Sequence, residues 1–240
     1  MIDNAIVITG GGQRLGLAFA KALHSKLTPV VITYRAERES ITELQNLGII
    51  CIKADFSTDE GVANFNQFIQ SNCSSLKAII HNASDWLAES AAVSPSETMQ
   101  SMMQVHVQAP YQLNLFLQPL LENYYLQTSN AADIIHLTDF VVGKGSKKHI
   151  AYAASKAALA NLTLSFSALL APKVKVNSIA PSLLMFNEND SDSYKQKTLK
   201  KSLMQIAPGE IEGVEAVQYL LNSRYITGHT LHLNGGRHLA

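Results

Sequence analysis

The chain of 240 residues has a formal net charge of zero, and 47% of its residues are hydrophobic while 16% are charged. This composition predicts a compact globular protein, and the length fits one large α/β domain or two small ones. Nucleic acid and anionic membranes are not expected as partners, because there is no basic excess to neutralise phosphates. No membrane span of ~18 apolar residues and no signal peptide is expected either.

The cysteines and histidines show no pattern of a metal site. Cys51 and Cys73 are the two cysteines, and they form no C-x-x-C motif. We interpret both as reduced thiols of a cytoplasmic protein. The eight histidines contain no H-x-x-x-H pair, so no bound metal is predicted.

A glycine-rich turn lies between a β-rich run at residues 5–9 and a segment with helical spacing. Glycines let backbone amides approach a pyrophosphate, and the helix N-terminus adds a partial positive charge. The spacing departs from the strict G-x-G-x-x-G motif, but its position between strand and helix predicts a dinucleotide site. The residues of this turn that we expect to contact the cofactor are Gly10, Gly12, Arg14, Leu15 and Gly16.

The second predicted strand, residues 29–34, ends with basic residues instead of the acidic residue that an NAD site usually has there for the ribose diol. The guanidinium of Arg35 suits a 2′-phosphate because of its bidentate geometry. We therefore expect NADPH to be the cofactor, with Tyr34 and Arg35 at its adenosine end. Arg38 is explained equally well as a charged residue at a solvated helix start.

The third predicted strand, residues 49–54, is followed by Asp55 and Phe56. Asp55 is placed either to bond the adenine amino group or to serve as a turn residue, and both residues are expected at the cofactor site. Thr58 then predicts the N-cap of a helix over about 59–69.

The fourth predicted strand, residues 76–80, leads into Asn82, Ala83 and Ser84, which we also expect at the cofactor. Asn82 is well placed to brace the cofactor backbone. Trp86 is the single tryptophan of the chain. It is either a packing residue or a stacking platform for a flat substrate.

A helical pattern covers residues 95–125, where Pro110 and Pro119 are expected to kink or divide the helix. Its apolar residues exceed what one sheet face requires, which indicates a subunit interface. The sixth strand, residues 174–179, is followed by three expected cofactor contacts. These are Pro181, Ser182 and Leu183. The polar segment 183–205 is typical of a mobile lid.

Tyr152 and Lys156 are four residues apart in a run of good helix formers, so their side chains share one helix face. A neighbouring ammonium favours phenolate, so we expect Lys156 to lower the pKa of Tyr152 and suit it to general acid catalysis. Asp139, directly after the fifth strand at 133–138, is placed to join this site. The alternative is a surface Tyr–Lys pair on an ordinary helix.

Strands alternate with helices along the whole chain, through a last helix near 210–221 and a last strand at 230–233. This order predicts an α/β fold of the Rossmann type in a single domain, 1–240: a doubly wound parallel sheet of about seven strands with helices on both faces. Ligands of such sheets bind beyond the carboxyl ends of the strands. The strand-end residues that mark this edge are Gly10, Arg35, Asp55, Asn82, Asp139 and Pro181.

Three motifs resemble those of the short-chain dehydrogenase/reductase family over essentially the whole chain. They are Thr9-Gly10-x-x-x-Arg14-x-Gly16, Asn82-Ala83-Ser84 and Tyr152-x-x-x-Lys156. The resemblance implies a nicotinamide cofactor, with catalysis by Tyr152 and Lys156. Asp139 stands where the family has a serine, and His106 where it has an asparagine. An ionised carboxylate only accepts hydrogen bonds, so ordinary carbonyl reduction is not expected.

Aspartate at position 139, with an aromatic residue just after Asn-Ala-Ser, is similar to the pteridine reductases. That resemblance implies a pterin held between nicotinamide and Trp86, with Arg14 and Ser84 near both ligands and with Asp139 and Tyr152 completing the substrate site. The implied activity is NADPH-dependent reduction of a 7,8-dihydropterin, dihydromonapterin or dihydrofolate, by hydride transfer to C6 and protonation of N5. The family is commonly tetrameric, so a homo-oligomer is expected.

Two alternative functions remain at this point. A general carbonyl or sugar dehydrogenase has the same fold, although Asp139 and Trp86 argue against it. A non-catalytic NADPH-binding module is less expected, because Tyr152 and Lys156 are both present. His106 either replaces the asparagine of the family in a water chain or is a satisfied core histidine, and we favour the core histidine.

Overall fold

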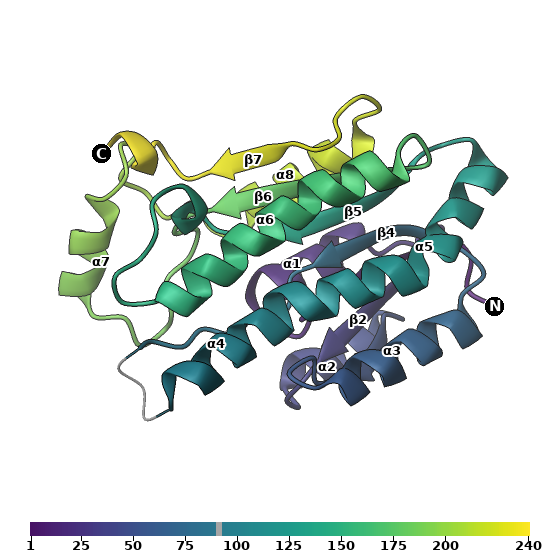
Figure 1. The fold of residues 1–240 in the computed structure, drawn as a ribbon, viewed down its shortest axis with the longest axis horizontal. Coiled ribbons are helices and arrows are strands. Elements are labelled where there is room, and N and C mark those ends of the chain that lie inside the picture. Colours follow the sequence, from purple (N-terminus) through teal and green to yellow (C-terminus); the bar gives the residue numbers. More distant parts are fainter. Residues whose placement is uncertain (90–92) are drawn as a thin grey trace.

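The structure, a computed structural model, describes residues 1–89 and 93–240 and has one sheet of parallel strands at its centre (Figure 1). The seven strands lie in the order β3-β2-β1-β4-β5-β6-β7. They are β1 Ala5–Ile8, β2 Val30–Tyr34, β3 Ile50–Lys53, β4 Leu76–His81, β5 Ala132–Leu137, β6 Val174–Pro181 and β7 Thr230–Leu233. The strand order reverses between β1 and β4, so the carboxyl ends of these strands flank the crevice where ligands of such sheets bind.

Helices cover both faces of the sheet, which confirms the predicted fold class (Figure 1). One face carries α1 Arg14–Leu23, α2 Glu39–Asn46 and α8 Ile211–Asn222. The other carries α3 Asp59–Asn72, α5 Ala109–Thr128 and α6 Ile150–Leu170. Four further helical segments are α4 Pro95–Met103, α7 Asp192–Leu199, η2 Phe140–Gly143 and η3 Arg237–Leu239.

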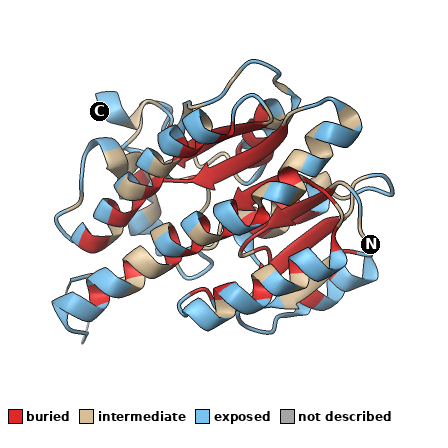
Figure 2. Ribbon diagram, turned by 45° about the vertical axis from the view of Figure 1, so that its right-hand side comes forward, coloured by how far each residue is buried: buried red, intermediate tan, exposed pale blue. Residues whose placement is uncertain are grey.

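The core forms two layers because successive strand residues point to opposite faces of the sheet. Ile6 and Ile8 pack with Phe19 of α1 in one layer. Val7, between them, packs with Phe65 of α3 in the other. Figure 2 shows the central strands as buried, with exposed residues on the outer sides of the helices. The edge strands β3 and β7 are only partly buried.

The middle helical segment is divided once. Between α4 and α5 lies a π-helix, η1 Gln104–Gln108, and Pro110 stands in the first turn of α5. Proline has no N–H to give to the carbonyl four residues earlier, so the chain widens where that bond would form. Helix α5 continues through Pro119 to Thr128, so the division that we considered at Pro119 does not occur.

Helix α6 is long and apolar enough to cross a membrane by length and composition, which the sequence-based expectation had excluded. It is the one such helix within residues 1–89 and 93–240. Of its most apolar stretch 44% is buried, and Phe166 and Leu170 belong to the core layer formed with α3 and α5. Its apolar composition therefore serves the packing of this domain.

Gly16 lets helix α1 begin in contact with the turn that precedes it. A Cβ atom at this position would lie 2.2 Å from the carbonyl oxygen of Gly10 and 2.6 Å from Nδ2 of Asn82. We expect Gly16→Ala to lower the free energy of unfolding by about 1–3 kcal/mol, because the contact has no room for a methyl group. Urea denaturation measures the difference.

Gly143→Ala is the matched control, because a Cβ atom there would have nothing within 4 Å. This variant should change the free energy of unfolding by less than ~0.5 kcal/mol. Equal stability losses in the two variants would contradict the tight contact at Gly16.

Candidate active site

The turn between β1 and α1 has its carbonyl groups already engaged. Nδ2 of Asn82 donates to the carbonyl oxygens of Thr9 at 3.1 Å and Gly10 at 2.9 Å. Oγ of Ser40 donates to the carbonyl of Gly12 at 2.6 Å. The first N–H groups of α1 have no partner within the helix, so donors and the positive helix end face outward. This arrangement fits a pyrophosphate, and Gly10, at φ +66°, adopts a left-handed conformation that favours glycine.

Asn82, which was expected to brace the cofactor backbone, lines the second compartment of the cleft described below, and its side chain spans the glycine turn. Oγ1 of Thr9 also accepts hydrogen bonds from the backbone N–H groups of Asn82, at 3.0 Å, and Ala83, at 2.9 Å. These contacts lock the end of β1 to the end of β4. The shape of the turn therefore depends on both strands.

An open cleft runs along the carboxyl edge of the sheet in two adjoining compartments, which share Gly10, Gln13, Ala83 and Ser84. The predicted cofactor residues Gly12, Tyr34, Arg35, Asp55 and Phe56 line the first compartment. The second is lined by Arg14, Leu15, Asn82, Pro181, Ser182 and Leu183. Gly16, Tyr152 and Lys156 are the predicted cofactor residues outside this lining.

The adenosine end of the cleft holds an ion pair that the sequence did not indicate. Nη1 and Nη2 of Arg35 donate to the two carboxylate oxygens of Asp85 at 2.8 and 3.1 Å. The carboxylate raises the pKa of Arg35, so its guanidinium stays charged. Both residues line the first compartment, and a 2′-phosphate there would meet the same bidentate donor.

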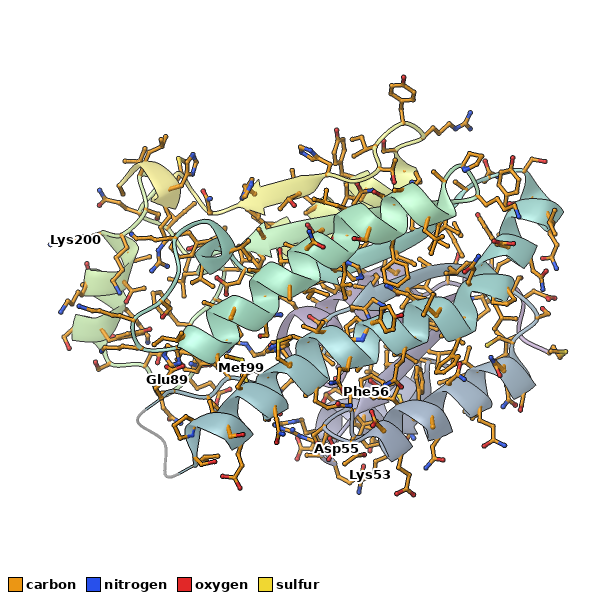
Figure 3. The ribbon with its side chains drawn as sticks, viewed as in Figure 1. Lys53, Asp55, Phe56, Glu89, Met99 and Lys200 are labelled. Atoms are coloured by element: carbon orange, nitrogen blue, oxygen red, sulfur yellow. The ribbon has the colours of Figure 1, made fainter. Side chains whose placement is uncertain are left out.

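Asp55 takes the turn role that we had left open. Its Oδ1 accepts from the backbone N–H of Ser57 at 3.0 Å, and this bond lowers the pKa of Asp55. Phe56 is 6% exposed and packs against Phe65 at a ring distance of 5.6 Å. Figure 3 labels Asp55 and Phe56 together, close to the end of β3.

Arg14 connects α1 to the segment after β6. Its backbone has φ +51°, an uncommon conformation for a residue other than glycine and one that recurs at functional sites. Its guanidinium donates to Oδ1 of Asn187 and, at 3.4 Å, to the carbonyl oxygen of Met185. Arg14 thus lies between the glycine turn and residues 183–205.

Asp139, Tyr152 and Lys156 meet next to one another. The phenol of Tyr152 donates to Oδ2 of Asp139 at 2.9 Å, and Oδ1 of Asp139 accepts from the backbone N–H of Val141 at 2.9 Å. Nζ of Lys156 donates to the carbonyl oxygen of Leu137 at 2.7 Å and lies 5.7 Å from the centre of the Tyr152 ring. The structure therefore brings together the three residues predicted to be catalytic.

The predicted fall in the pKa of Tyr152 is wrong for this arrangement. Burial, and then the negative charge of Asp139, raise the pKa of Tyr152 above its usual value near 10. Burial lowers the pKa of Lys156 to about 8, so it remains an ammonium at neutral pH. The Asp139 carboxylate is hydrogen-bonded to the phenol, whereas the Lys156 ammonium is not. The helical spacing of Tyr152 and Lys156 contains no information on this carboxylate.

Trp86 is an exposed aromatic residue in the loop that follows β4. Its side chain is 67% exposed and stacks on His149 with ring centres 4.3 Å apart and planes at 24°. Nδ1 of His149 donates to the carbonyl oxygen of Leu87 at 3.0 Å, which holds that ring in place. Trp86 is thus not a core residue, although it is not among the residues that line the two compartments.

His106 is buried at 1% exposure and hydrogen-bonded on both sides, as expected for a satisfied core histidine. Its Nε2 lies 2.8 Å from Oγ of Ser84, and its Nδ1 lies 2.8 Å from Oγ of Ser155. Its ring also meets that of Tyr152 edge-on at 5.4 Å.

Sequence reasoning missed several residues that support the site. Arg237 donates to Oγ of Ser182 at 3.0 Å and lies 4.4 Å from the ring centre of Phe140, next to Asp139. Asp85, His149 and Ser155 were missed as well. No sequence pattern pairs these residues, because their partners come from distant parts of the chain.

No metal site is found in the part of the chain that the structure describes. Within residues 1–89 and 93–240, no three His, Cys, Asp or Glu side chains are grouped so that they could hold a metal ion. Cys51 and Cys73 are both free thiols.

Comparison with known proteins finds named relatives whose similarity extends over almost the whole chain. A reductase from Enterobacter sp. (strain 638), named dihydromonapterin reductase, is 54% identical over 234 residues, which are 98% of this chain and 96% of the relative. The protein of the same name from Escherichia coli (strain K12) is 51% identical over the same shares of the two chains.

Solved structures share the fold. The FolM alternative dihydrofolate reductase 1 from Brucella canis, complexed with NADP, has a TM-score of 0.85 and 25% identity, over 99% of this chain and 94% of that chain. RhlG from Pseudomonas aeruginosa, in a complex with NADP, has a TM-score of 0.86 at 23% identity, over 98% and 96%, which supports the fold alone. The family model of the short chain dehydrogenases matches residues 4–197. The chain therefore belongs to the short-chain dehydrogenase family.

Proposed function

We propose that this protein reduces a 7,8-dihydropterin to its tetrahydro form with NADPH as the reductant. The observation that carries the proposal is the 2.9 Å hydrogen bond from Tyr152 to Asp139, which puts an acceptor-only carboxylate beside the catalytic phenol. Such a pair suits protonation of a ring nitrogen better than polarisation of a ketone. The relatives named dihydromonapterin reductase, at 51–54% identity, support the same substrate class.

The cleft residues fit NADPH along its length. Arg35 would hold the 2′-phosphate, the donors of the glycine turn the pyrophosphate, and Asn82 to Ser84 together with Pro181 to Leu183 the nicotinamide end. Lys156 would bond the nicotinamide ribose. When bound, NADPH supplies the hydride that reduces the pterin at C6. The solved Brucella relatives that contain NADP support this cofactor.

Tyr152 would hold the proton that N5 receives. Its raised pKa keeps the phenol protonated at neutral pH, so the proton is present when the substrate binds. Once the proton leaves, the Lys156 ammonium, 5.7 Å from the ring centre, stabilises the resulting phenolate. Asp139 orients the phenol and accepts hydrogen bonds from the amino-pyrimidine edge of the substrate.

Trp86 would form one wall of the pterin site. Its ring is fixed on one side by His149, and its exposed surface offers a flat apolar face to a flat ligand. Arg14 and Ser84, which line the second compartment, would contact both substrate and cofactor. A rigid stacking surface contributes to catalysis by holding the two reacting rings in register.

The alternative activities are less well supported. A general carbonyl or sugar dehydrogenase needs a hydroxyl donor where Asp139 stands, and it has no use for the indole of Trp86. A non-catalytic NADPH-binding module would not need the contact between Tyr152 and Asp139.

The proposal also covers the domain organisation of the protein, its oligomeric state and its location in the cell. The whole chain would act as a single domain with residues 183–205 as a lid, and copies would associate into a homo-tetramer. Exposed apolar residues on α5 and α6 support association, among them Tyr111, Phe116, Leu164 and Leu169. The free thiols Cys51 and Cys73 fit a cytoplasmic location.

Steady-state oxidation of NADPH tests the activity directly. We expect turnover with dihydromonapterin and with dihydrofolate, and a lower kcat/KM with NADH, because Arg35 has no phosphate to bind in that cofactor. Cyclohexanone and simple sugars are the comparison substrates. A folded protein that binds NADPH but turns over neither pterin would exclude the proposed function.

Trp86→Ala tests the stacking surface. We expect the KM for the dihydropterin to rise roughly tenfold, since stacking of a base on an aromatic ring is worth about 1–3 kcal/mol. Trp86→Phe should stay within about threefold of the wild type, because a smaller aromatic face remains.

The KM for NADPH should not change in either Trp86 variant. Tyr225→Ala is the control for loss of an exposed aromatic ring, since Tyr225 is 99% exposed. If Trp86→Ala leaves the KM for the dihydropterin at the wild-type value, Trp86 is not the wall of the pterin site.

The pKa of Lys156 predicts the pH dependence of the reaction. Because burial lowers this pKa to about 8 in the free protein, the ammonium is present below that pH and is lost above it. The kcat/KM for NADPH, which reports on free enzyme, should be flat near pH 7 and fall about tenfold per pH unit above about 8.5. Tyr152 adds no inflection in this range, because its pKa is raised.

Lys156→Arg provides the comparison, because a guanidinium stays charged throughout the same range. Whatever activity this variant keeps should show no fall near pH 8. A wild-type profile that is flat to about pH 9.5 would contradict the role of the ammonium.

A further inference from the structure

We propose that His106 is a positioning residue of this active site, and that it fixes the direction of the Ser84 hydroxyl so that Ser84 offers the bound dihydropterin a hydrogen-bond acceptor. The inference rests on the proposed function and concerns the same site. His106 lies between the loop after β4, which holds Ser84, and α6, which holds Ser155 and Tyr152. It joins the predicted substrate loop to the catalytic helix.

The hydrogen bonds around the imidazole define which ring nitrogen carries the proton. The backbone N–H of Asp85 points to Nε2 at 3.3 Å, and a backbone amide can only donate. Nε2 therefore accepts, and the proton of the neutral ring is on Nδ1. Nδ1 donates to Oγ of Ser155 at 2.8 Å, and Ser155 passes its own proton to the carbonyl oxygen of Tyr152 at 2.8 Å.

The same assignment settles the direction of the Ser84 hydroxyl. Since Nε2 of His106 accepts, the single proton of Ser84 lies along the 2.8 Å contact to that nitrogen. The competing acceptor, the carbonyl oxygen of Asp85, is farther away at 3.3 Å. The lone pairs of Ser84 are left for a ligand, and this exposed residue lines both compartments of the cleft.

A ligand that meets these lone pairs has to donate. The amino group and the ring N–H groups of a dihydropterin are such donors, whereas a ketone or an aldehyde is only an acceptor. Ser84 held in this direction would therefore favour a nitrogen heterocycle over the carbonyl substrates that a hydroxyl donor would suit. His106 would determine this preference without touching the substrate.

The neutral ring is stable in its surroundings. His106 is 1% exposed, and burial together with the nearby Lys156 ammonium lowers its pKa to about 2. Its ring lies nearly perpendicular to that of Tyr152, whose phenol remains protonated. The ring thus keeps an accepting Nε2 over the whole range in which the enzyme would work.

The backbone conformation around His106 is a second, independent indication that this residue has a role in the site. Residues Gln104–Gln108 form a π-helix, a rare conformation that appears mostly as single turns within α-helices and is frequent at functional sites. Pro110 follows in the first turn of α5 and cannot donate to the carbonyl of His106. The widened turn places the imidazole in the space between Ser84 and Ser155.

Two amide variants, His106→Gln and His106→Asn, distinguish the role of Nε2 from that of Nδ1. The amide of His106→Gln extends to about the place of Nε2, so its carbonyl can still accept from Ser84. The shorter amide of His106→Asn reaches only about the place of Nδ1 and leaves Ser84 free to rotate. Loss of one hydrogen bond of this kind is worth roughly three- to tenfold in binding.

The experiment is steady-state oxidation of NADPH with dihydromonapterin in the wild type, both amide variants, Ser84→Ala and the double variant Ser84→Ala/His106→Asn. We expect His106→Asn to raise the KM for the dihydropterin roughly three- to tenfold with a smaller change in kcat, and His106→Gln to stay within about threefold. In the Ser84→Ala background, His106→Asn should add less than about twofold, because the group that it orients is gone. Thermal unfolding is recorded for every variant.

Three results of this experiment would overturn the inference. If His106→Asn raises the KM by the same factor with and without the Ser84 hydroxyl, His106 acts on the fold alone and the inference is overturned. A wild-type KM in His106→Asn overturns it as well. If the wild type itself does not turn over dihydromonapterin, the proposed function fails and this inference fails with it.

Discussion

The hydrogen bonds of Asn82 are the contacts on which the rest of the site depends. One amide group holds the carbonyls of Thr9 and Gly10, and the backbone of the same residue is tied to the hydroxyl of Thr9. These bonds join the ends of β1 and β4, between which the strand order reverses. With the acceptors of the turn engaged from behind, its free N–H groups face the crevice, where an anion is stabilised.

The cleft extends in two directions from the glycine turn. Toward β2 the cleft ends at Arg35, the charged group that is proposed to bind the 2′-phosphate of the dinucleotide. Toward β5 and α6 it approaches Asp139, Tyr152 and Lys156, where burial of the ionisable groups sets their protonation. The loop after β4 belongs to both ends, because Ser84 lines both compartments.

The fold was predictable from the sequence because its signals are local. Strands such as β7, Thr230–Leu233, were predicted at the residues where they occur. The effect of proline was harder to predict. Pro110 stands beside a change of helix type, whereas Pro119 is accommodated within α5, and the difference depends on tertiary packing that spacing does not encode.

The sequence predicted which motif residues come together at the candidate site, but it did not predict their electrostatics or the residues that support them. Motif positions predicted that Asp139, Tyr152 and Lys156 share one site, and helical spacing predicted the shared face of Tyr152 and Lys156. The sign of the pKa shift of Tyr152 was missed, because it depends on burial and on the distance to Asp139. The partners of His106 and Arg35 were missed for a similar reason, since both contacts join segments that only the folded chain brings together.

The ion pair between Arg35 and Asp85 means that the adenosine end of the cleft carries its own counter-ion. The Arg35 side chain is 59% exposed and that of Asp85 26%, so an incoming phosphate can reach the guanidinium without opening the core. In the proposed function, binding of NADPH would then be an anion exchange, in which the 2′-phosphate displaces the Asp85 carboxylate from Arg35. The preference for NADPH over NADH would then equal the difference in free energy between the Arg35–phosphate pair and the Arg35–Asp85 pair. This preference would be smaller than the one that a guanidinium without a carboxylate partner would give.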